Sequence, residues 1–330
     1  MKRSWGYFKF LFVWATVLVF SLTACQKEMP GRLDGMYSSG ETSSGTVSSQ
    51  AAEEEASPPE SDEEKNTSAT ADKKKYTTPP FRSGSYVMES SSVSEQYFYS
   101  GKSVISYTRV SQIYTYGIKL TVNKNGSMSA VYTFKRIRTG YETEEGAIAT
   151  DTAEKSGRNE DNAVYYDLIG QKFTVNISKD YKITVKGIDA IHKKYPYTAD
   201  IVTNENMKEV ASDLFYRIDG TIQQGSSWSL KQVGLKNTYT VSSFKDGSVY
   251  INIAGSQINL PEPFTTEDGM SYTYTKCEPL SGSLVMSIDN RMLQEQSSYQ
   301  ENSGKVEYNG HSYTFKVSAA SVCNISASEK

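Results

Sequence analysis

The chain has few of the residues on which catalysis and metal binding most often depend. Its 330 residues include two histidines, His192 and His311, and three cysteines, Cys25, Cys277 and Cys323. It has no Gly-x-Ser-x-Gly, His-Glu-x-x-His or Cys-x-x-Cys motif and no glycine-rich phosphate loop. We therefore expect no enzyme activity and no cofactor, and an envelope hydrolase ranks last among the functions that remain.

An excess of positive charge is also absent. The formal net charge is -3, and it falls to about -6 once the three basic residues of the N-terminal segment are removed. Because nucleic-acid binding depends on neutralising phosphates with basic side chains, we expect no nucleic-acid partner.

Long apolar runs are absent except at the N-terminus. Lys2, Arg3 and Lys9 precede an apolar stretch, Phe10 to Leu22, and small residues then precede Cys25. About 13 residues at ~1.5 Å each span roughly 20 Å, less than the ~30 Å hydrocarbon core of a bilayer. The pattern predicts a cleaved signal peptide over residues 1–24.

The last residues of this segment, Leu22-Thr23-Ala24-Cys25, resemble the lipobox of bacterial lipoproteins. The resemblance implies export, cleavage before Cys25, and lipidation of its sulfur. Two or three acyl chains would hold the protein on the outer face of the plasma membrane, or on the outer membrane of a host with two membranes. The expected membrane partner is thus reached through Cys25.

Residues 25–80 are rich in Ser, Thr, Glu and Pro and nearly lack large apolar side chains. Such a segment cannot bury enough surface to offset its ordering entropy, so we expect a disordered tether. A coil of about 55 residues averages roughly 40 Å of reach, enough to hold a folded domain clear of a bilayer.

The remaining residues have the composition of a β protein, with 24 Tyr in the chain and abundant Thr, Ser and Val. Alternation of apolar and polar residues predicts one antiparallel meander over residues 81–202 and a second over 219–330. Asn125-Gly126 predicts a two-residue hairpin turn in which both positions have positive φ. Lys245-Asp246-Gly247 predicts a turn, and Asn309-Gly310 predicts the final hairpin.

Residues 138–162 are acidic and poor in apolar side chains. Oxygen ligands suit Ca²⁺, but the spacing matches no calcium loop and Lys155 and Arg158 interrupt it. We therefore expect an exposed, mobile insertion in the first meander and no metal site.

A change of period to helical spacing occurs over residues 203–218. Met207, Val210, Ala211, Leu214 and Phe215 recur on one face, which predicts an amphipathic helix capped by Thr203 or Asn204 and packed on a sheet.

The two meanders show traces of an internal duplication. Residues 103–110 parallel 226–233, Asn125-Gly126 parallels Asp246-Gly247, and Gly170 parallels Gly282. The alternative is the generic similarity of β-meanders. Two duplicated meanders that close on each other would form a barrel or half-barrel with one central helix.

Cys277 and Cys323 remain once Cys25 is lipidated. In an exported domain they either form a disulfide, which would stabilise by ~3–4 kcal/mol on the chain-entropy model, or remain two separate thiols.

The folded part also resembles an uncharacterised family of bacterial secreted and lipid-anchored proteins. The resemblance rests on 168–175, then 185–189, then a helix, then Gly225-Ser226-Ser227-Trp228. Family members usually have Gly-Asp-Ser-Trp at the last position, so the Asp is missing here. The family implies an envelope address and no established activity.

Two functions rank above the hydrolase. The first is a tethered binding or scaffold module whose Tyr and Trp side chains contact an envelope protein or glycan; Trp228 is a candidate contact, although a core role is the commoner one. The alternative is a half-barrel carrier of a lipid or other apolar ligand.

Overall fold

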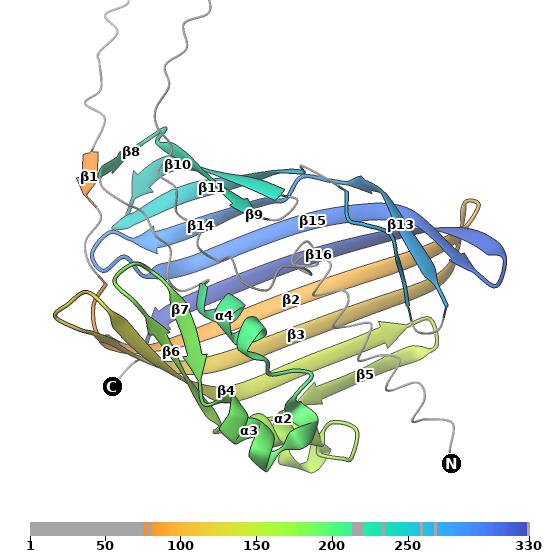
Figure 1. The fold of residues 1–330 in the computed structure, drawn as a ribbon, viewed down its shortest axis with the longest axis horizontal. Coiled ribbons are helices and arrows are strands. Elements are labelled where there is room, and N and C mark those ends of the chain that lie inside the picture. The colour runs from red at the N-terminus through yellow and green to blue at the C-terminus, as the bar shows by residue number, and fades with distance from the viewer. Residues whose placement is uncertain are drawn as a thin grey trace, which may run out of the picture.

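The protein is dominated by one large antiparallel sheet. The computed structural model describes residues 75–77, 81–212, 221–232, 235–257, 260–266 and 269–328. Fourteen strands form the sheet, and its outermost strands β7 and β9 do not pair with each other. The sheet curves strongly and stays open (Figure 1), which confirms the predicted mostly β half-barrel. Cys25, the signal segment and all but three residues of the predicted tether lie outside the described residues.

The strands of the first part are β1 (Lys75–Thr77), β2 (Gly84–Ser100), β3 (Ser103–Val122), β4 (Met128–Thr143), β5 (Gly146–Asp151), β6 (Lys172–Ile177) and β7 (Ile183–Lys186). Those of the second are β8 (Thr221–Gln223), β9 (Ser227–Gln232), β10 (Leu235–Lys245), β11 (Ser248–Gln257), β12 (Phe264–Thr265), β13 (Ser271–Cys277), β14 (Ser281–Ser287), β15 (Leu293–Tyr308) and β16 (His311–Ala327). The helices are η2 (Lys155–Gly157), α2 (Ala163–Leu168), α3 (Ile188–Lys194), η3 (Pro196–Thr198) and α4 (Asn204–Ser212).

Two meanders meet at the centre of the sheet. The order is β7-β6-β4-β3-β2-β16-β15-β14-β11-β10-β9. The first and last long strands of the folded part, β2 and β16, pair from Tyr86↔Ala327 to Tyr99↔Thr314. This central pairing joins the N-terminal meander to the C-terminal one.

The meanders share a strand order, as the predicted duplication requires. In each, a hairpin (β3–β4 or β10–β11) is followed by an insertion and then by the next strand of the sheet, β6 or β14. The sequence match of 103–110 with 226–233 does not hold in space, because β3 is one strand of 20 residues whereas β9 folds back on β10. Alternation alone cannot distinguish one long strand from two short ones joined by a tight turn.

The hairpin turns follow their glycines. Asp246 and Gly247 have φ of 49° and 72°, and Asn309 and Gly310 have 51° and 76°, so turns lie at both predicted places. The two-residue turn predicted at Asn125-Gly126 is wrong: only Gly126 has a positive φ, and the Asn123 N–H donates to the Ser127 carbonyl at 2.8 Å. The connection is a three-residue loop with a glycine in the left-handed position.

Three predictions about irregular segments were wrong. The predicted insertion over 138–162 is mostly regular, because β4 runs on to Thr143 and pairs with β5. The meander predicted over residues 81–202 is interrupted after Gly187, where the chain forms helix α3. Lys75–Thr77, placed in the tether, pair with β8. Charged residues make strands hard to recognise from the sequence of such segments, because a strand can carry charged side chains on the face of a sheet that is exposed to solvent.

Helix α4 confirms the first half of the predicted amphipathic helix. The Thr203 hydroxyl accepts a hydrogen bond from the Asn206 N–H at 3.0 Å, and Met207 and Ala211 are buried. The predicted residues 213–218 lie outside the described part of the chain.

A candidate binding face inside the half-barrel

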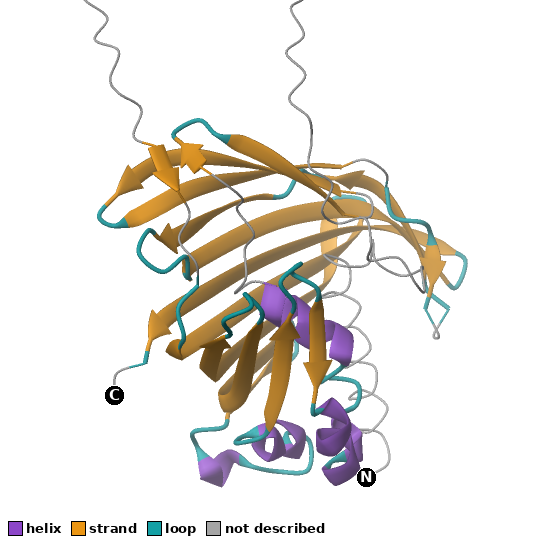
Figure 2. Ribbon diagram, turned by 60° about the vertical axis from the view of Figure 1, so that its left-hand side comes forward, coloured by secondary structure: helices purple, strands orange, loops and turns teal. Residues whose placement is uncertain are grey.

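The inner face of the sheet is identified by its largest hydrophobic cluster. This cluster joins Phe173 of β6, near one edge of the sheet, to Tyr239 of β10, near the other edge, and to Met207 and Ala211 of α4. The cluster therefore runs across one face of the sheet and includes residues of α4. Figure 2 shows one helix lying within the curve of the sheet and the others at its lower margin. We call this cluster the packed end.

The packed end is filled by aromatic side chains. Tyr132 and Phe173 stack with their ring centroids 4.9 Å apart, and Tyr116 meets Phe134 at 5.1 Å. All four residues are at most 2% exposed. Burial raises the pKa of Tyr116, so its phenol stays neutral. Since side chains occupy this part of the interior, it serves as the folding core.

Farther along the same strands the inner face changes character. Six residues opposite one another on six neighbouring strands form what we call the polar row: Ser298, Ser321, Ser92, Gln112, Thr139 and Thr150. They lie on the same face as Met88 and Tyr116 because they are an even number of positions away along β2 and β3. At ~4.8 Å per strand the row is roughly 24 Å long. All six residues are partly exposed.

The next two rows mix amides with apolar side chains. One contains Gln300, Ala319, Ser94, Val110, Tyr141 and Ile148, and the other Asn302, Val317, Gln96, Thr108 and Thr143. Gln300 Nε2 donates to the Glu278 carbonyl at 3.3 Å. Asn302 is 6% exposed, and its Oδ1 accepts no hydrogen bond among the described residues.

A second, smaller hydrophobic cluster closes the far end of this face. Tyr272, Tyr274, Val306, Phe315 and Val317 are its buried members. Gly304 is required there, because a Cβ at this position would lie 2.2 Å from the Thr273 carbonyl oxygen. The inner face therefore has a polar stretch between two apolar clusters.

The five long strands carry no charged residue on the inner face. Every Asp, Glu, Lys and Arg of β2, β3, β4, β15 and β16 lies at outer-face positions or in the bulge at Lys135. There they pair with one another across strands: Glu89 with Arg138 at 2.8 Å and Glu301 with Lys316 at 2.7 Å. The polar stretch of the inner face is thus neutral.

Two outer-face carboxylates show the effect of this pairing. Hydrogen bonding to Arg136 lowers the pKa of Asp151 to about 2. Hydrogen bonding to Lys316 likewise lowers the pKa of Glu301. These carboxylates stay ionised at neutral pH, and none of them faces the interior.

Sequence reasoning missed the polar row. A signal was present in β2, where the inner positions change from Tyr86 and Met88 to Ser90, Ser92 and Ser94. An inner face that turns polar in mid-strand means that the strand extends beyond the core. Without register, however, these serines cannot be assigned to a face.

The structure does not bring Cys277 and Cys323 together. Cys277 lies opposite Asn302 and Cys323 opposite Gln296, and these partners are six residues apart on β15. At ~3.3 Å per residue the separation is roughly 20 Å, far beyond disulfide reach. The possible disulfide is therefore not formed, and Cys323 is a buried residue of the packed end.

The other sequence candidates are also separated. His192 on α3 lies 2.7 Å from the Val202 carbonyl oxygen through its Nε2, whereas His311 begins β16 at the far end of the sheet. Trp228 stacks on Tyr239 with centroids 5.6 Å apart and packs against the packed end. Trp228 is thus a core contact.

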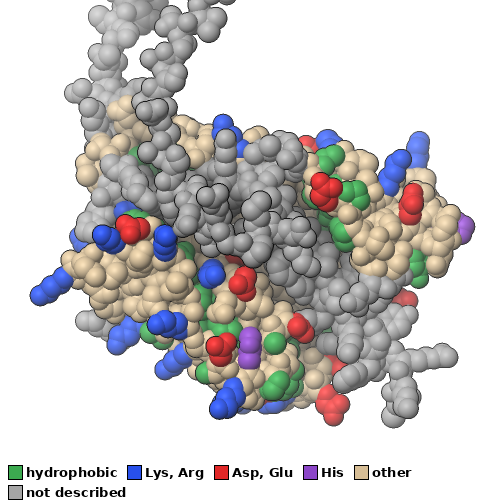
Figure 3. Space-filling view, viewed as in Figure 1, with side chains coloured by type: hydrophobic (Ala, Val, Ile, Leu, Met, Phe, Trp, Pro, Cys, Tyr) green, Lys and Arg blue, Asp and Glu red, His purple; other side chains and the backbone are tan. Residues whose placement is uncertain are grey.

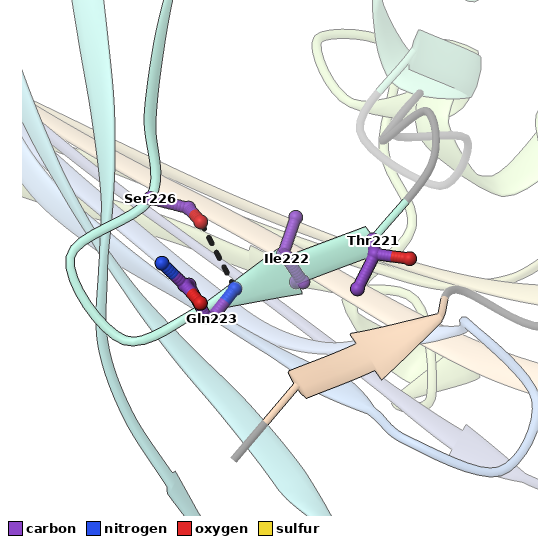
Figure 4. A pocket seen from close by; sticks show the side chains of 4 residues that line it. All are labelled: Thr221, Ile222, Gln223 and Ser226. Atoms are coloured by element: carbon purple, nitrogen blue, oxygen red, sulfur yellow. Dashed lines mark hydrogen bonds between the residues drawn. The ribbon is translucent and has the colours of Figure 1, made fainter. Parts of the chain in front are cut away.

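A cavity of about 340 Å³ lies beside β8, away from the polar row. Thr221, Ile222, Gln223 and Ser226 line it, and the Ser226 hydroxyl accepts a hydrogen bond from the Gln223 N–H at 2.9 Å (Figure 4). Among the described residues its lining holds no acidic, basic or histidine side chain, so none of these lies beside the Thr221 and Ser226 hydroxyls as an acid or base.

Within the described residues, no group of His, Cys, Asp and Glu is arranged to hold a metal ion. Over the same residues, no helix has the length and hydropathy to cross a membrane. On the face shown in Figure 3, basic side chains gather on the left, where β6 and β7 lie in Figure 1, and acidic and basic side chains are mixed over the rest.

Neither a family model nor a curated protein matches the sequence of this chain. Among solved structures, that of lipovitellin, studied for its lipid–protein interactions, matches 76% of this chain at 9% sequence identity, with a TM-score of 0.46. This chain spans 26% of the lipovitellin chain. The likeness is too slight to carry any inference about a ligand.

Proposed function

We propose that this protein is an exported, lipid-anchored envelope protein whose half-barrel binds a neutral polar ligand along the polar row. The observation that carries the proposal is an inner face that is lined by hydroxyls and amides and lacks charge. The anchor rests on the lipobox at Cys25, and the binding role on the sheet.

A neutral glycan is the ligand class that this chemistry favours. Ser92, Gln112 and Thr139 offer donors and acceptors in a line, as a chain of sugar hydroxyls requires. Tyr141, one row away, adds an aromatic ring. An anionic ligand would find no cation on this face, so its desolvation would be uncompensated.

A carrier of an apolar ligand is the second candidate. It is favoured by Val110, Tyr141 and Ile148, which give the row beside the polar row an apolar stretch. Against it stands the packed end, where aromatic side chains already fill the interior. We therefore rank the carrier below the glycan-binding module.

Titration of the full chain with three probes distinguishes these candidates. The probes are neutral oligosaccharides of two to eight sugars, matched oligosaccharides with carboxylates, and a fluorescent fatty acid. The proposal predicts saturable heat of binding with the neutral set, weaker binding with the acidic set, and no specific binding of the fatty acid. Binding of the fatty acid alone would replace the proposal with the carrier.

The anchor is tested separately by Cys25→Ser. The substitution removes the acylated sulfur, so the chain should lose metabolic labelling by an alkyne fatty acid and move from the membrane to the soluble fraction. Cys277→Ser is the matched control and should remain labelled. A Cys25→Ser chain that is still labelled and membrane-bound would contradict the anchor.

A further inference from the structure

Strand β5 presents an open edge. Within the described part of the chain it pairs with β4 alone, and it forms the lower right margin of the sheet in Figure 1. Thr143 and Gly146 flank the two-residue turn of this hairpin, so they form its first hydrogen-bonded pair. By alternation, the N–H and C=O groups of Ala147 and Ala149 point away from β4. Among the described residues, nothing pairs with them.

The two edges at the ends of the strand order carry the protection that sheets usually need. Helix α4 packs against β7, which also ends on Lys186. Strand β9 includes Lys231 in its sequence. Lysine and covering elements are common defences against edge-to-edge pairing. β5 therefore stands apart from both of these edges.

The sequence of β5 has neither lysine nor proline. From Gly146 to Asp151 it reads Gly-Ala-Ile-Ala-Thr-Asp, and its one charged residue, Asp151, is bound to Arg136 of β4. Ile148 is 61% exposed, more than any other large hydrophobic residue that the structure describes. Small neighbours on both sides of Ile148 leave room for another backbone to approach.

We propose that β5 pairs antiparallel with β5 of a second copy of this chain. A two-fold axis at Ile148 sets Ile148 against Ile148 of the other copy and Ala147 against Ala149. The outward groups of Ala147 and Ala149 then exchange four hydrogen bonds, and each copy covers the other's exposed isoleucine. Self-complementarity is the reason to choose a second copy over a different protein.

The flanking charges are compatible with this register. Glu145 of one copy comes opposite Asp151 of the other, which alone would be repulsive. Asp151, however, already accepts a hydrogen bond from Arg136 Nε at 2.9 Å. In the proposed dimer, the Arg136 guanidinium bound to Asp151 of one copy therefore lies near Glu145 of the other copy and offsets the repulsion.

The pairing is short, so the dimer is weak and its population rises with protein concentration. Attachment of many copies to one membrane surface would raise their local concentration.

Cysteine cross-linking in the full chain tests both the pairing and its register. Opposed Cβ atoms lie ~4.5–5.5 Å apart in such pairs, so Ile148→Cys should give a disulfide-linked dimer under mild oxidation. Ala147→Cys should cross-link with Ala149→Cys when the two variants are mixed, and poorly with itself.

Two comparisons complete the test. Ile105→Cys, 48% exposed on β3, should cross-link no more than the wild-type chain, which reports any dimer formed through native cysteines. Ile148→Lys should sediment as a monomer at concentrations where the wild-type chain dimerises. Cross-linking of Ile148→Cys at the Ile105→Cys level, or to a different protein in cells, would overturn the proposal.

Discussion

Two parts of the inner face are built from the same strands and differ in polarity and exposure. In the packed end, Met88, Tyr116 and Phe173 are at most 2% exposed and share one hydrophobic cluster with α4 residues. Four positions farther along β2 and β3, Ser92 and Gln112 occupy the same face and are partly exposed. A single sheet thus carries a folding core at one end and, beside it, a partly exposed polar stretch.

The length of the strands explains how one sheet can contain both the packed end and the polar row. β2, β3 and β16 have 17, 20 and 17 residues, whereas strands in globular proteins average about 5–6. The packed end needs only part of each strand. The rest of each strand is held in place by pairing with its neighbours, so its inner-face side chains can contact a ligand instead of forming the core.

Truncation of a large apolar residue gives the largest expected difference between a core position and an exposed one. Phe173→Ala removes a ring from the packed end and should lower the free energy of unfolding by about 3–5 kcal/mol. Ile105→Ala, at an exposed position, should change it by less than about 0.5 kcal/mol. Denaturant unfolding of both variants measures this; equal losses would show that the core has been misplaced.

Charge removal on the outer face gives the smallest effect. Arg136→Gln should lower the Tm by no more than about 2 °C at pH 7, because the pair with Asp151 is near water. The folded-state pKa of Asp151 is about 2, below its ordinary value of 3.8. Its stabilisation is therefore present above pH 4 and lost as pH falls toward 2, so the two chains should converge over that window.

Lys245→Gln is the control for this titration. Lys245 lies 3.7 Å from Asp246, and both side chains are more than 70% exposed. The difference in Tm between Lys245→Gln and the wild-type chain should not shrink in the same way as pH falls from 4 toward 2. An Arg136→Gln difference that persists unchanged at pH 2 would contradict the assigned cause of the shift.

Much of the fold could be predicted because it is encoded locally. Alternation predicted the strands around Ile118 and Val175. Asp246-Gly247 and Asn309-Gly310 predicted the turns of two later hairpins. What failed depends on distant partners. β5 is strand because β4 pairs with it, and Cys277 and Cys323 are separated by a register that no local pattern contains.

The candidate site was less predictable than the fold. The polar row is assembled from six strands, and each contributes one ordinary Ser, Thr or Gln. No spacing in the sequence links Ser298 to Gln112. Only the pairing of β16 with β2, the last strand with the first long one, places them in one line.

The most direct test of the central claim compares two double variants at neighbouring positions on opposite faces. Ser92→Ala with Gln112→Leu removes two members of the polar row, whereas Ser91→Ala with Ile113→Leu changes the adjacent register pair on the outer face. With a neutral oligosaccharide that binds the wild-type chain, the inner pair should bind roughly 10–30-fold more weakly at about 1 kcal/mol per hydrogen bond. The outer pair should bind as the wild-type chain does. Equal affinities for both variants, with both folded by circular dichroism, would contradict the account.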